Sequence, residues 1–565
     1  MRRLIVLVLL AVVGCRSSSE QPAATPTAPH REQRLTSATI SDPKTFNPLL
    51  AVDQASVLAV ADLFEGLVRL NPLTLEMEPL LAERWEYNGD GTVCTFYLRH
   101  NVRWHDGQPF AAADVAFTFD AIYDERVPNS TKYVLLIEGK RIRVEVVDDY
   151  TVRLILPRPF APLINSLSQP ILPAHILAAS LKDGTFAQQW GIDTPPDKIV
   201  GTGPYRMVRY VQAQFIEYRR NPEYWMHDDA GVRLPYLEAQ TRLIVPTQDT
   251  MYLKFVSGQT DVLTPRPEEV AELRAKADAL KITVAELGIE PGTTFVSFNR
   301  NPRHYVKSGK TDPRLTWFTD PNFLRAIAHA IDKQSMIVNC LNGYGKPAVA
   351  EISPENKIYH NPNLTDYAYD LDEAKRLLAA AGYVDRDGDG VIEDSAGNPI
   401  EFSLNTNAGN QVREKICSIL KEDWTKLGMK VNYRPLDFTA LVEKVDNTFD
   451  WDAILIGFTG TVDPNNSANL LRSNGNLHLW NPSEPKPATP WEAEIDSLLD
   501  QGSRAIDVQK RRTFYWRIQE ILHEQLAMIQ TVRQTQFSVY KNVLQNFRPT
   551  VWEPYRPELI RVADN

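Results

Sequence analysis

Between residues 400 and 458, short apolar stretches alternate with a segment of helical periodicity, and no other feature of the chain constrains the fold as strongly. Strand-like stretches cover residues 400–404, 429–433 and 453–458, and residues 412–427 carry apolar side chains at helical spacing. The last strand is apolar throughout, which indicates burial on both faces. We therefore predict a parallel or mixed sheet that helices cover on both faces, that is, an α/β domain in the second half of the chain.

Further helices and a late strand are expected in the same half, including helical patterns at residues 438–445, 491–499 and 510–525. Apolar residues recur at helical spacing over residues 323–340, which predicts one helix there. A second helix is expected to begin after Asp370, with Glu373 completing a capping box. Residues 529–540 predict a strand that returns towards another lobe.

The first half of the chain carries mainly strand patterns. Residues 143–147 and 150–156 predict a hairpin with two aspartates in its turn. Residues 205–210 and 215–219 predict a second strand pair, which follows a break rich in glycine and proline.

Length and charge narrow the class of protein. The chain has 565 residues, which suggests two to four domains at about 100–200 residues each. Hydrophobic residues make up 43% and charged residues 23%, a balance that can form a large core. The net charge of −10 and the absence of a basic run argue against binding to nucleic acid.

The first residues have the pattern of a secretory signal. Two arginines precede an apolar run over residues 4–13, which is too short to span a membrane, and small residues then lead to Cys15. This stretch resembles a lipobox, in which Cys15 is lipidated and becomes the mature N-terminus; the alternative is an ordinary signal peptide with an incidental cysteine. We assign residues 1–14 to the signal peptide and residues 15–36 to the lipidated cysteine and a flexible tether. No later stretch reaches about 18 apolar residues, so the lipid is the only membrane contact expected.

The remaining cysteines are Cys94, Cys340 and Cys417, and all three lie in apolar patterns. An exported compartment permits one disulfide between two of them, and the sequence does not choose the pair. Buried free thiols are the simpler expectation.

Several short motifs occur in a fixed order from about residue 38 to residue 464. They are Leu63–Val68, Leu98–Gly107, Gly201–Tyr205, Asn221–Trp225, Arg325–Asp332 and Gly343–Pro347. In this order they resemble the bacterial extracellular solute-binding proteins of family 5, which bind peptides and nickel. The resemblance implies a two-lobed α/β fold of the periplasmic-binding-protein type (type II), with an extra subdomain in lobe I. It also implies that the lobes close on a solute, which the permease of an ABC transporter then accepts.

The resemblance gives a division of the chain. Lobe I is expected to comprise residues 37–72, 200–290 and 530–565. Residues 73–199 are expected to form the extra subdomain of lobe I, and residues 291–529 to form lobe II.

The loop after the last apolar strand is the candidate ligand-binding site, because ligands of open α/β sheets lie beyond the carboxyl ends of the strands. The residues assigned to it are Gly457, Phe458, Thr459, Gly460 and Asp463, and Trp480 is added as an aromatic that stacks on ligand.

The same loop departs from the pattern of the peptide binders. The resemblance implies that an aspartate four residues before the proline binds the α-ammonium of a peptide, and Gly460 stands at that position. The loop then supplies only backbone groups and more room, and Asp463, next to Pro464, is directed into a turn. We therefore expect no peptide binding through the usual acid, unless an acid from another segment serves the ammonium.

A second candidate site is an acidic loop between a helix and a strand. Asp385, Asp387 and Asp389 stand at loop positions one, three and five, and Gly390 stands at six, as in the opening of a calcium loop. Position twelve is an alanine, so Glu393 or Asp394 would have to complete the site. The assigned ligands are Asp385, Asp387, Asp389, Val391, Glu393 and Asp394. A structural Ca²⁺ is the expectation, and a solvated acidic turn is the alternative.

Motifs of enzymes are incomplete in this chain. His523 and Glu524 lack the second histidine of a zinc-protease helix, and the stretch before Lys310 and Thr311 lacks the first glycine of a phosphate loop. We expect no catalysis and no catalytic cofactor.

The expected function is that of a monomeric extracytoplasmic lipoprotein that captures a peptide or peptide-like solute and delivers it to an ABC transporter permease. The first alternative is a non-peptide solute such as an oligosaccharide, a haem-like compound or a metal chelate. The second alternative is an envelope enzyme or chaperone.

Overall fold

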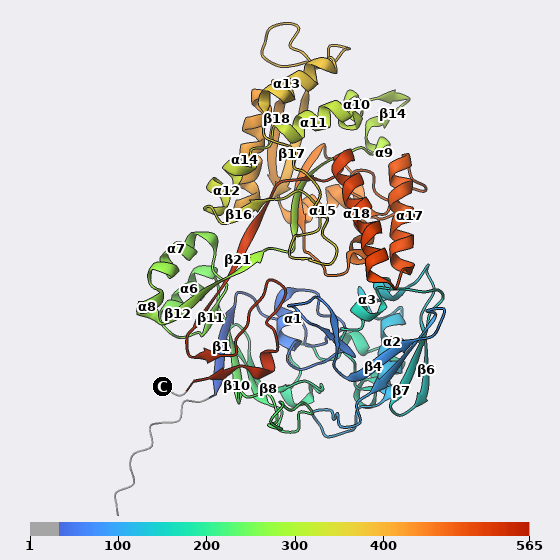
Figure 1. Cartoon of the computed structure of the whole chain (residues 1–565), viewed down its shortest axis with the longest axis vertical. Coiled ribbons are helices and arrows are strands. Elements are labelled where there is room, and N and C mark those ends of the chain that lie inside the picture. Colours follow the sequence, from blue (N-terminus) through green and yellow to red (C-terminus); the bar gives the residue numbers. More distant parts are fainter. Residues whose placement is uncertain (1–32, 564–565) are drawn as a thin grey trace, which may run out of the picture.

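The computed structural model describes residues 33–563 and shows two lobes, one above the other in Figure 1. The predicted signal peptide and Cys15 lie outside the described residues. Lobe I is built on a four-stranded sheet of order β1-β10-β9-β8. Its strands are β1 (Arg34–Thr39), β8 (Tyr205–Val211), β9 (Phe215–Arg220) and β10 (Ala239–Ile244). The strand pair predicted around residues 205–219 is confirmed as β8 and β9.

The predicted tether overlaps the first strand of this sheet. β1 begins at Arg34 and pairs in parallel with β10, with Arg34 opposite Ala239. The tether can therefore extend no further than Gln33, because the backbone of residues 34–36 belongs to the sheet. The sequence did not predict this strand, because most of its side chains are polar.

The extra subdomain holds a second sheet, which is antiparallel throughout and has the order β4-β5-β7-β6. Its strands are β4 (Ala82–Tyr87), β5 (Val93–Leu98), β6 (Arg143–Asp148) and β7 (Thr151–Ile155). The predicted hairpin is confirmed as β6 and β7. α2 (Ala112–Tyr123) packs on this sheet, and one continuous hydrophobic core joins the subdomain to the rest of lobe I.

Lobe II contains the predicted mixed sheet, of order β18-β17-β19-β13-β20. Its strands are β13 (Thr293–Phe298), β17 (Glu401–Asn407), β18 (Lys430–Leu436), β19 (Ala453–Phe458) and β20 (Ile529–Gln530). β17 pairs in parallel with β18 and β19, whereas β13 runs antiparallel to β19. The α/β prediction for this half is confirmed.

Both faces of the central strand β19 are buried, which explains its apolar sequence. Ala453 and Leu455 belong to the core on one face, and Ile454 belongs to the core on the other. The first core includes side chains of α11 (Pro321–His329), α12 (Lys333–Leu341), α13 (Leu371–Ala380) and α14 (Gln411–Lys426). The second includes side chains of α15 (Phe438–Glu443), α17 (Pro490–Arg504) and α18 (Val508–Gln525).

The helix predicted over residues 323–340 is two helices. α11 ends at His329, and α12 begins after Asp332, whose carboxylate accepts a hydrogen bond from the Ser335 amide. The apolar periodicity runs through the break and conceals it. Asp370 caps α13 as predicted, but Glu373 pairs with Arg376 rather than completing a capping box.

Other elements complete the two lobes. In the first half they are α1 (Gln54–Val60), β2 (Val68–Leu70), β3 (Met77–Pro79), α3 (Thr131–Leu135), α4 (Leu163–Ser166), α5 (Ala174–Lys182), α6 (Gln248–Val256), α7 (Pro267–Ala275) and α8 (Ala277–Leu280). In the second half they are α9 (Pro302–Tyr305), β14 (Val306–Lys307), β15 (Lys310–Thr311), α10 (Pro313–Thr319), β16 (Gly345–Pro347), α16 (Ala468–Leu471), β22 (Leu544–Gln545) and β23 (Arg561–Val562).

The chain crosses between the lobes at two places that lie side by side. β12 (Ile282–Ile289) continues through Pro291 into β13, and β20 continues through Thr531 into β21 (Val532–Lys541). β21 pairs with β12 and with β11 (Val262–Leu263), and Figure 1 shows it running from lobe II to that small sheet. The predicted returning strand is thus β20 followed by β21.

Cys94, Cys340 and Cys417 are buried free thiols, as predicted. Among the described residues, no helix is both long and apolar enough to cross a membrane.

Candidate ligand-binding cleft

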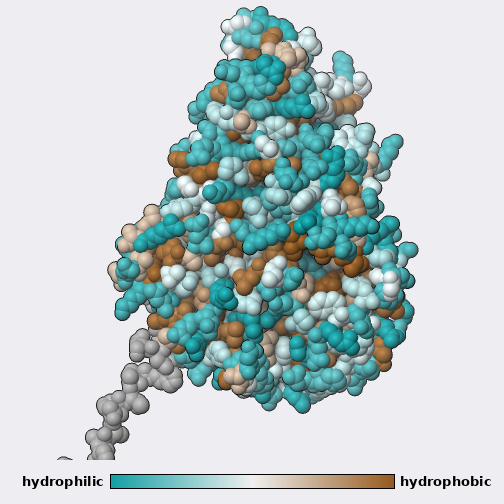
Figure 2. All heavy atoms as spheres, in the orientation of Figure 1, coloured by the Kyte–Doolittle hydropathy of each residue, from teal (hydrophilic) through white to brown (hydrophobic). Residues whose placement is uncertain are grey.

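A pocket lies between the two lobes, beside the crossings. Lobe II provides most of its walls, and Trp552 of the C-terminal segment closes it from lobe I. The residues that line it are Pro291, Thr293, Glu351, Ile352, Ser353, Asn356, Phe458, Thr459, Gly460, Thr461, Pro464, Ser467, Leu470, Leu471, Tyr515, Met528 and Trp552. Figure 2 shows apolar residues along the groove between the lobes. The loop that follows β19 therefore reaches the cleft, at the position that the sequence predicted.

Gly460 is packed against the crossing segment and leaves no room for a side chain. A Cβ atom at Gly460 would lie 2.1 Å from the carbonyl oxygen of Pro291 and 2.3 Å from its carbonyl carbon. The expectation that glycine gives the loop more room is therefore wrong, since the backbone at Pro291 fills that space. The loop can present backbone groups at this position, but no carboxylate.

Phe458 and Thr459 lie in the pocket, as expected, and Phe458 stacks on Phe295 with ring centroids 6.1 Å apart. Gly457 precedes them but faces the sheet. A Cβ atom at Gly457 would lie 2.6 Å from the carbonyl oxygen of Thr293 on the neighbouring strand. Its role is therefore close backbone packing, and it does not line the pocket.

Asp463 is buried below the loop in an ion pair and does not line the pocket. Its carboxylate accepts hydrogen bonds from both terminal nitrogens of Arg511, at 2.7 and 2.6 Å. It also accepts from the Asn465 amide at the start of a short 3₁₀ turn, Pro464–Ser467. Burial lowers the pKa of Arg511, but Asp463 outweighs this effect and the net pKa is raised. The predicted turn role is what the geometry shows, and the assignment of Asp463 as a ligand-binding residue is corrected.

Trp480 is also outside the cleft. Its side chain is 1% exposed within the core beneath α17, and its indole nitrogen donates to Glu492 Oε1 at 3.0 Å. The assignment rested on residue type alone, which cannot separate a core tryptophan from one that contacts a ligand.

Glu351 is the carboxylate that the cleft does contain. It lies in the wall of the pocket and is half-buried. Burial raises the pKa of Glu351 to about 7, and its own backbone amide and Arg533 oppose this effect only in part. The hydrogen bond that Arg533 donates to this residue goes to the Glu351 backbone carbonyl.

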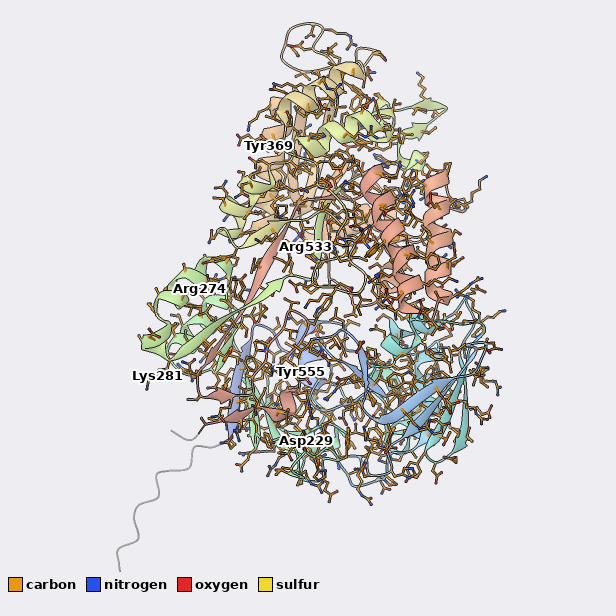
Figure 3. The ribbon with its side chains drawn as sticks, in the orientation of Figure 1. Asp229, Arg274, Lys281, Tyr369, Arg533 and Tyr555 are labelled. Atoms are coloured by element: carbon orange, nitrogen blue, oxygen red, sulfur yellow. The ribbon has the colours of Figure 1, made fainter. Side chains whose placement is uncertain are left out.

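Arg533 holds the two crossings together beneath Glu351. The guanidinium is 2% exposed and donates to the carbonyl oxygens of Gly292, Ala350 and Glu351. Burial lowers the pKa of Arg533 to about 10. Figure 3 shows Arg533 at the lower edge of lobe II, above Tyr555 of lobe I. Its donors are directed to these backbone carbonyls rather than to the Glu351 carboxylate.

Glu351 and Arg533 were not predicted from the sequence. Neither residue belongs to a chemical motif, and the segment around Glu351 has no periodic pattern. The only local signal is the proline and glycine at 291–292, which indicates a break in the chain near the cleft. This signal does not identify Glu351 or Arg533.

The family is settled by the extent of the match. The profile of the bacterial extracellular solute-binding proteins, family 5, matches residues 76–478. The chain belongs to this family. Curated relatives of this family-5 protein include a probable ABC transporter-binding protein of Deinococcus radiodurans, 28% identical over 88% of this chain and 86% of the relative. The oligopeptide-binding protein AppA of Bacillus subtilis is 26% identical over 81% of this chain and 80% of that protein.

Solved structures share the two-lobed fold of this family-5 protein. NikA of Brucella suis, in complex with Fe(III)-EDTA, matches with a TM-score of 0.77 and 23% identity. The match covers 94% of this chain and 100% of the NikA chain. AppA of Bacillus subtilis, in complex with a nonapeptide, matches with a TM-score of 0.71 and 23% identity over 94% of this chain and 100% of that chain. The predicted type II two-lobed fold is confirmed.

The acidic loop of this family-5 protein lies at the far end of lobe II, beyond α13 (Figure 1). Oxygen atoms of Asp385, Asp387, Asp389 and Glu393 all lie within 4.8 Å of one another. Asp385 accepts hydrogen bonds from the amides of Gly388 and Gly390, and both glycines have positive φ, at 81° and 89°. The loop thus gathers four of the predicted calcium ligands.

Asp394 points away from this group. Its carboxylate accepts hydrogen bonds from the indole of Trp317 and from the side chain of Asn398. The assignment of Asp394 as a calcium ligand is therefore corrected. Val391 lies beside the group, and its amide donates to Asp389.

Proposed function

We propose that this chain captures a peptide or peptide-like solute in the cleft between its lobes and delivers it to the permease of an ABC transporter, without catalysing a reaction. We further propose that the lipid on Cys15 anchors a monomeric protein to the cell envelope. Membership of the family supports solute binding, and the names of oligopeptide- and dipeptide-binding relatives support the peptide class.

The observation that carries the proposal is the Glu351 carboxyl group in the wall of the cleft. A carboxylate that loses water when the lobes close is stabilised by a cation at its side. The α-ammonium of a peptide supplies such a cation and also donates hydrogen bonds, which are stronger when both groups are charged.

Neither position of the loop itself that the family pattern marks can fill this role. Gly460 has no space for a side chain, and Asp463 is already neutralised by Arg511. The ammonium site thus moves from the loop after β19 to the segment before Ser353, on the other side of the pocket.

Isothermal titration calorimetry of the wild type and Glu351→Gln tests the proposal with di- to pentapeptides, each with a free and an acetylated N-terminus. We expect the free peptides to bind the wild type at least tenfold more tightly than the acetylated ones, and Glu351→Gln to remove the difference. Glu422→Gln on the exposed side of α14 is the matched control and should bind as the wild type does. Equal affinity for free and acetylated peptides, unchanged in Glu351→Gln, would contradict the role of Glu351.

We also propose a structural Ca²⁺ in the acidic loop, held by Asp385, Asp387, Asp389 and Glu393. Calcium takes carboxylate oxygens, and the four side chains are close enough to share one ion after a small contraction. Hydrogen bonds from backbone amides hold Asp385 and Asp389 in place, and Glu393 is buried. The ion would stabilise the tip of lobe II and would have no contact with the cleft.

A further inference from the structure

A second group of metal-ligating side chains lies inside lobe II, away from both the cleft and the acidic loop. His478, Glu484 and Glu492 each place a ligand atom within 4.8 Å of the other two. Their side chains belong to buried residues that are 0%, 4% and 3% exposed. His478 and Glu484 come from the irregular segment after α16, and Glu492 comes from the first turn of α17.

The group contains buried polar atoms without partners. Among the described residues, neither ring nitrogen of His478 makes a hydrogen bond, and Glu484 Oε1 makes none either. A buried polar atom without a partner costs about 1–3 kcal/mol. Three such atoms on two neighbouring side chains lack a well-placed partner, since even the nearest acceptor of His478, Glu492 Oε1, lies 3.5 Å from Nε2.

In both glutamates, Oε2 accepts hydrogen bonds from nearby backbone or hydroxyl groups, and Oε1 faces the three-residue group. Glu484 Oε2 accepts a hydrogen bond from the Ala488 amide. Glu492 Oε2 accepts from the amide and the hydroxyl of Thr489, both at 2.8 Å. Glu492 Oε1 accepts from Trp480 and still has a lone pair for another ligand. Contacts of this kind orient the ligands of metal sites.

One distance fits a shared ion better than a hydrogen bond. His478 Nε2 lies 3.5 Å from Glu492 Oε1. Nitrogen and oxygen ligands bind Zn²⁺ at about 2.0–2.1 Å, so two ligands of a tetrahedral ion lie about 3.4 Å apart. One histidine and two carboxylates would also balance the charge of a divalent ion inside the protein.

A surface groove borders the group on the side of Glu492, while His478 and Glu484 lie behind it. A groove at the surface of lobe II is lined by Arg300, Trp480, Asn481, Trp491 and Glu492, among others. An ion would enter from this side of the group. Arg300 is the nearby cation, and its guanidinium is directed to the carbonyl oxygens of Gln525 and Leu526.

From these observations we infer that His478, Glu484 and Glu492 bind a divalent transition-metal ion, for which Zn²⁺ is the expected occupant. The ion is structural, because it joins the segment 472–489 to α17 and lies apart from the cleft. It makes the fold of this segment depend on metal, whether or not the solute is a peptide.

Metal analysis and thermal unfolding of the full chain test the inference. Protein stripped with chelator and then given Zn²⁺ should bind a single ion per chain at this site and unfold at a temperature several degrees higher, since an ion that binds only the folded state stabilises it. Glu484→Gln keeps the shape of the side chain and should abolish the Zn²⁺-dependent rise. Glu494→Gln on the exposed face of α17 and Asp387→Ala in the acidic loop should retain it.

The competing explanation is a proton shared by the two buried glutamates, without metal. In that case Zn²⁺ leaves the unfolding temperature of the wild type unchanged, and Glu484→Gln is as stable as the wild type. That pair of results would overturn the inference. If Glu484→Gln does not fold, His478→Gln takes its place. Absorption of the Co²⁺-loaded wild type gives an independent result, because a tetrahedral site with a histidine ligand yields intense visible bands and an empty site yields none.

Discussion

Asp463→Asn separates a structural role of this residue from a role in binding. In the wild type both carboxylate oxygens receive charged hydrogen bonds from Arg511, and both side chains are 5% exposed. Removing one partner of a buried pair costs about 3–5 kcal/mol, because the other charge stays buried without compensation. Asparagine keeps one acceptor for the Asn465 amide, so we expect the lower end, about 3 kcal/mol.

Urea unfolding followed by tryptophan fluorescence measures this loss. Since two lobes need not unfold together, the transition of lobe II is compared between variants. Asp372→Asn, at an exposed position in the first turn of α13, is the control and should change stability by less than about 0.5 kcal/mol. The structural account would be refuted if Asp463→Asn lost less than about 1 kcal/mol while its affinity for solute fell by tenfold or more.

Three other predictions concern charge, metal and location. The pKa of Glu351 is raised from 4.5 to about 7, so affinity for a peptide ammonium should rise with pH up to about 7, below the pH of about 8 at which the ammonium itself loses its proton. In Glu351→Gln the affinity should stay flat over this range. The same shift makes this group's contribution to the stability of the empty protein fall as pH rises from about 4.5 to 7. Calorimetry at several pH values would contradict the affinity prediction by showing equal profiles for the two proteins. Calcium should raise the unfolding temperature of metal-stripped wild type, and Asp387→Ala should remove that rise; no rise in the wild type would exclude the calcium site. Cys15→Ser should leave the protein soluble in detergent phase separation while the wild type enters the detergent phase, and equal partitioning would exclude the lipid anchor.

The sequence predicted the α/β half of the fold because its signals are local. The apolar run of β19 and the periodicity of α14 report burial directly, and the structure has both. The break between α11 and α12 was missed because the apolar spacing continues through it, while the cap at Asp332 is a single polar residue.

The binding site was predicted only in part, because some of its residues follow from chain direction and others depend on tertiary packing. The loop of Phe458 to Gly460 follows from the rule on strand ends, which depends on chain direction alone. Whether Asp463 or Trp480 faces the cleft depends on tertiary partners, Arg511 and Glu492, which local sequence patterns do not reveal. Glu351 depends in the same way on long-range packing, since burial at the crossings gives it its raised pKa.

Native mass spectrometry of protein purified from its own host identifies the solute that the cleft binds. The wild type should carry a co-purified solute whose fragments identify a peptide or peptide-like compound with a free amine, and Glu351→Gln should carry much less of it. A bound sugar, haem-like compound or metal chelate at equal occupancy in both proteins would show that Glu351 does not select a peptide ammonium.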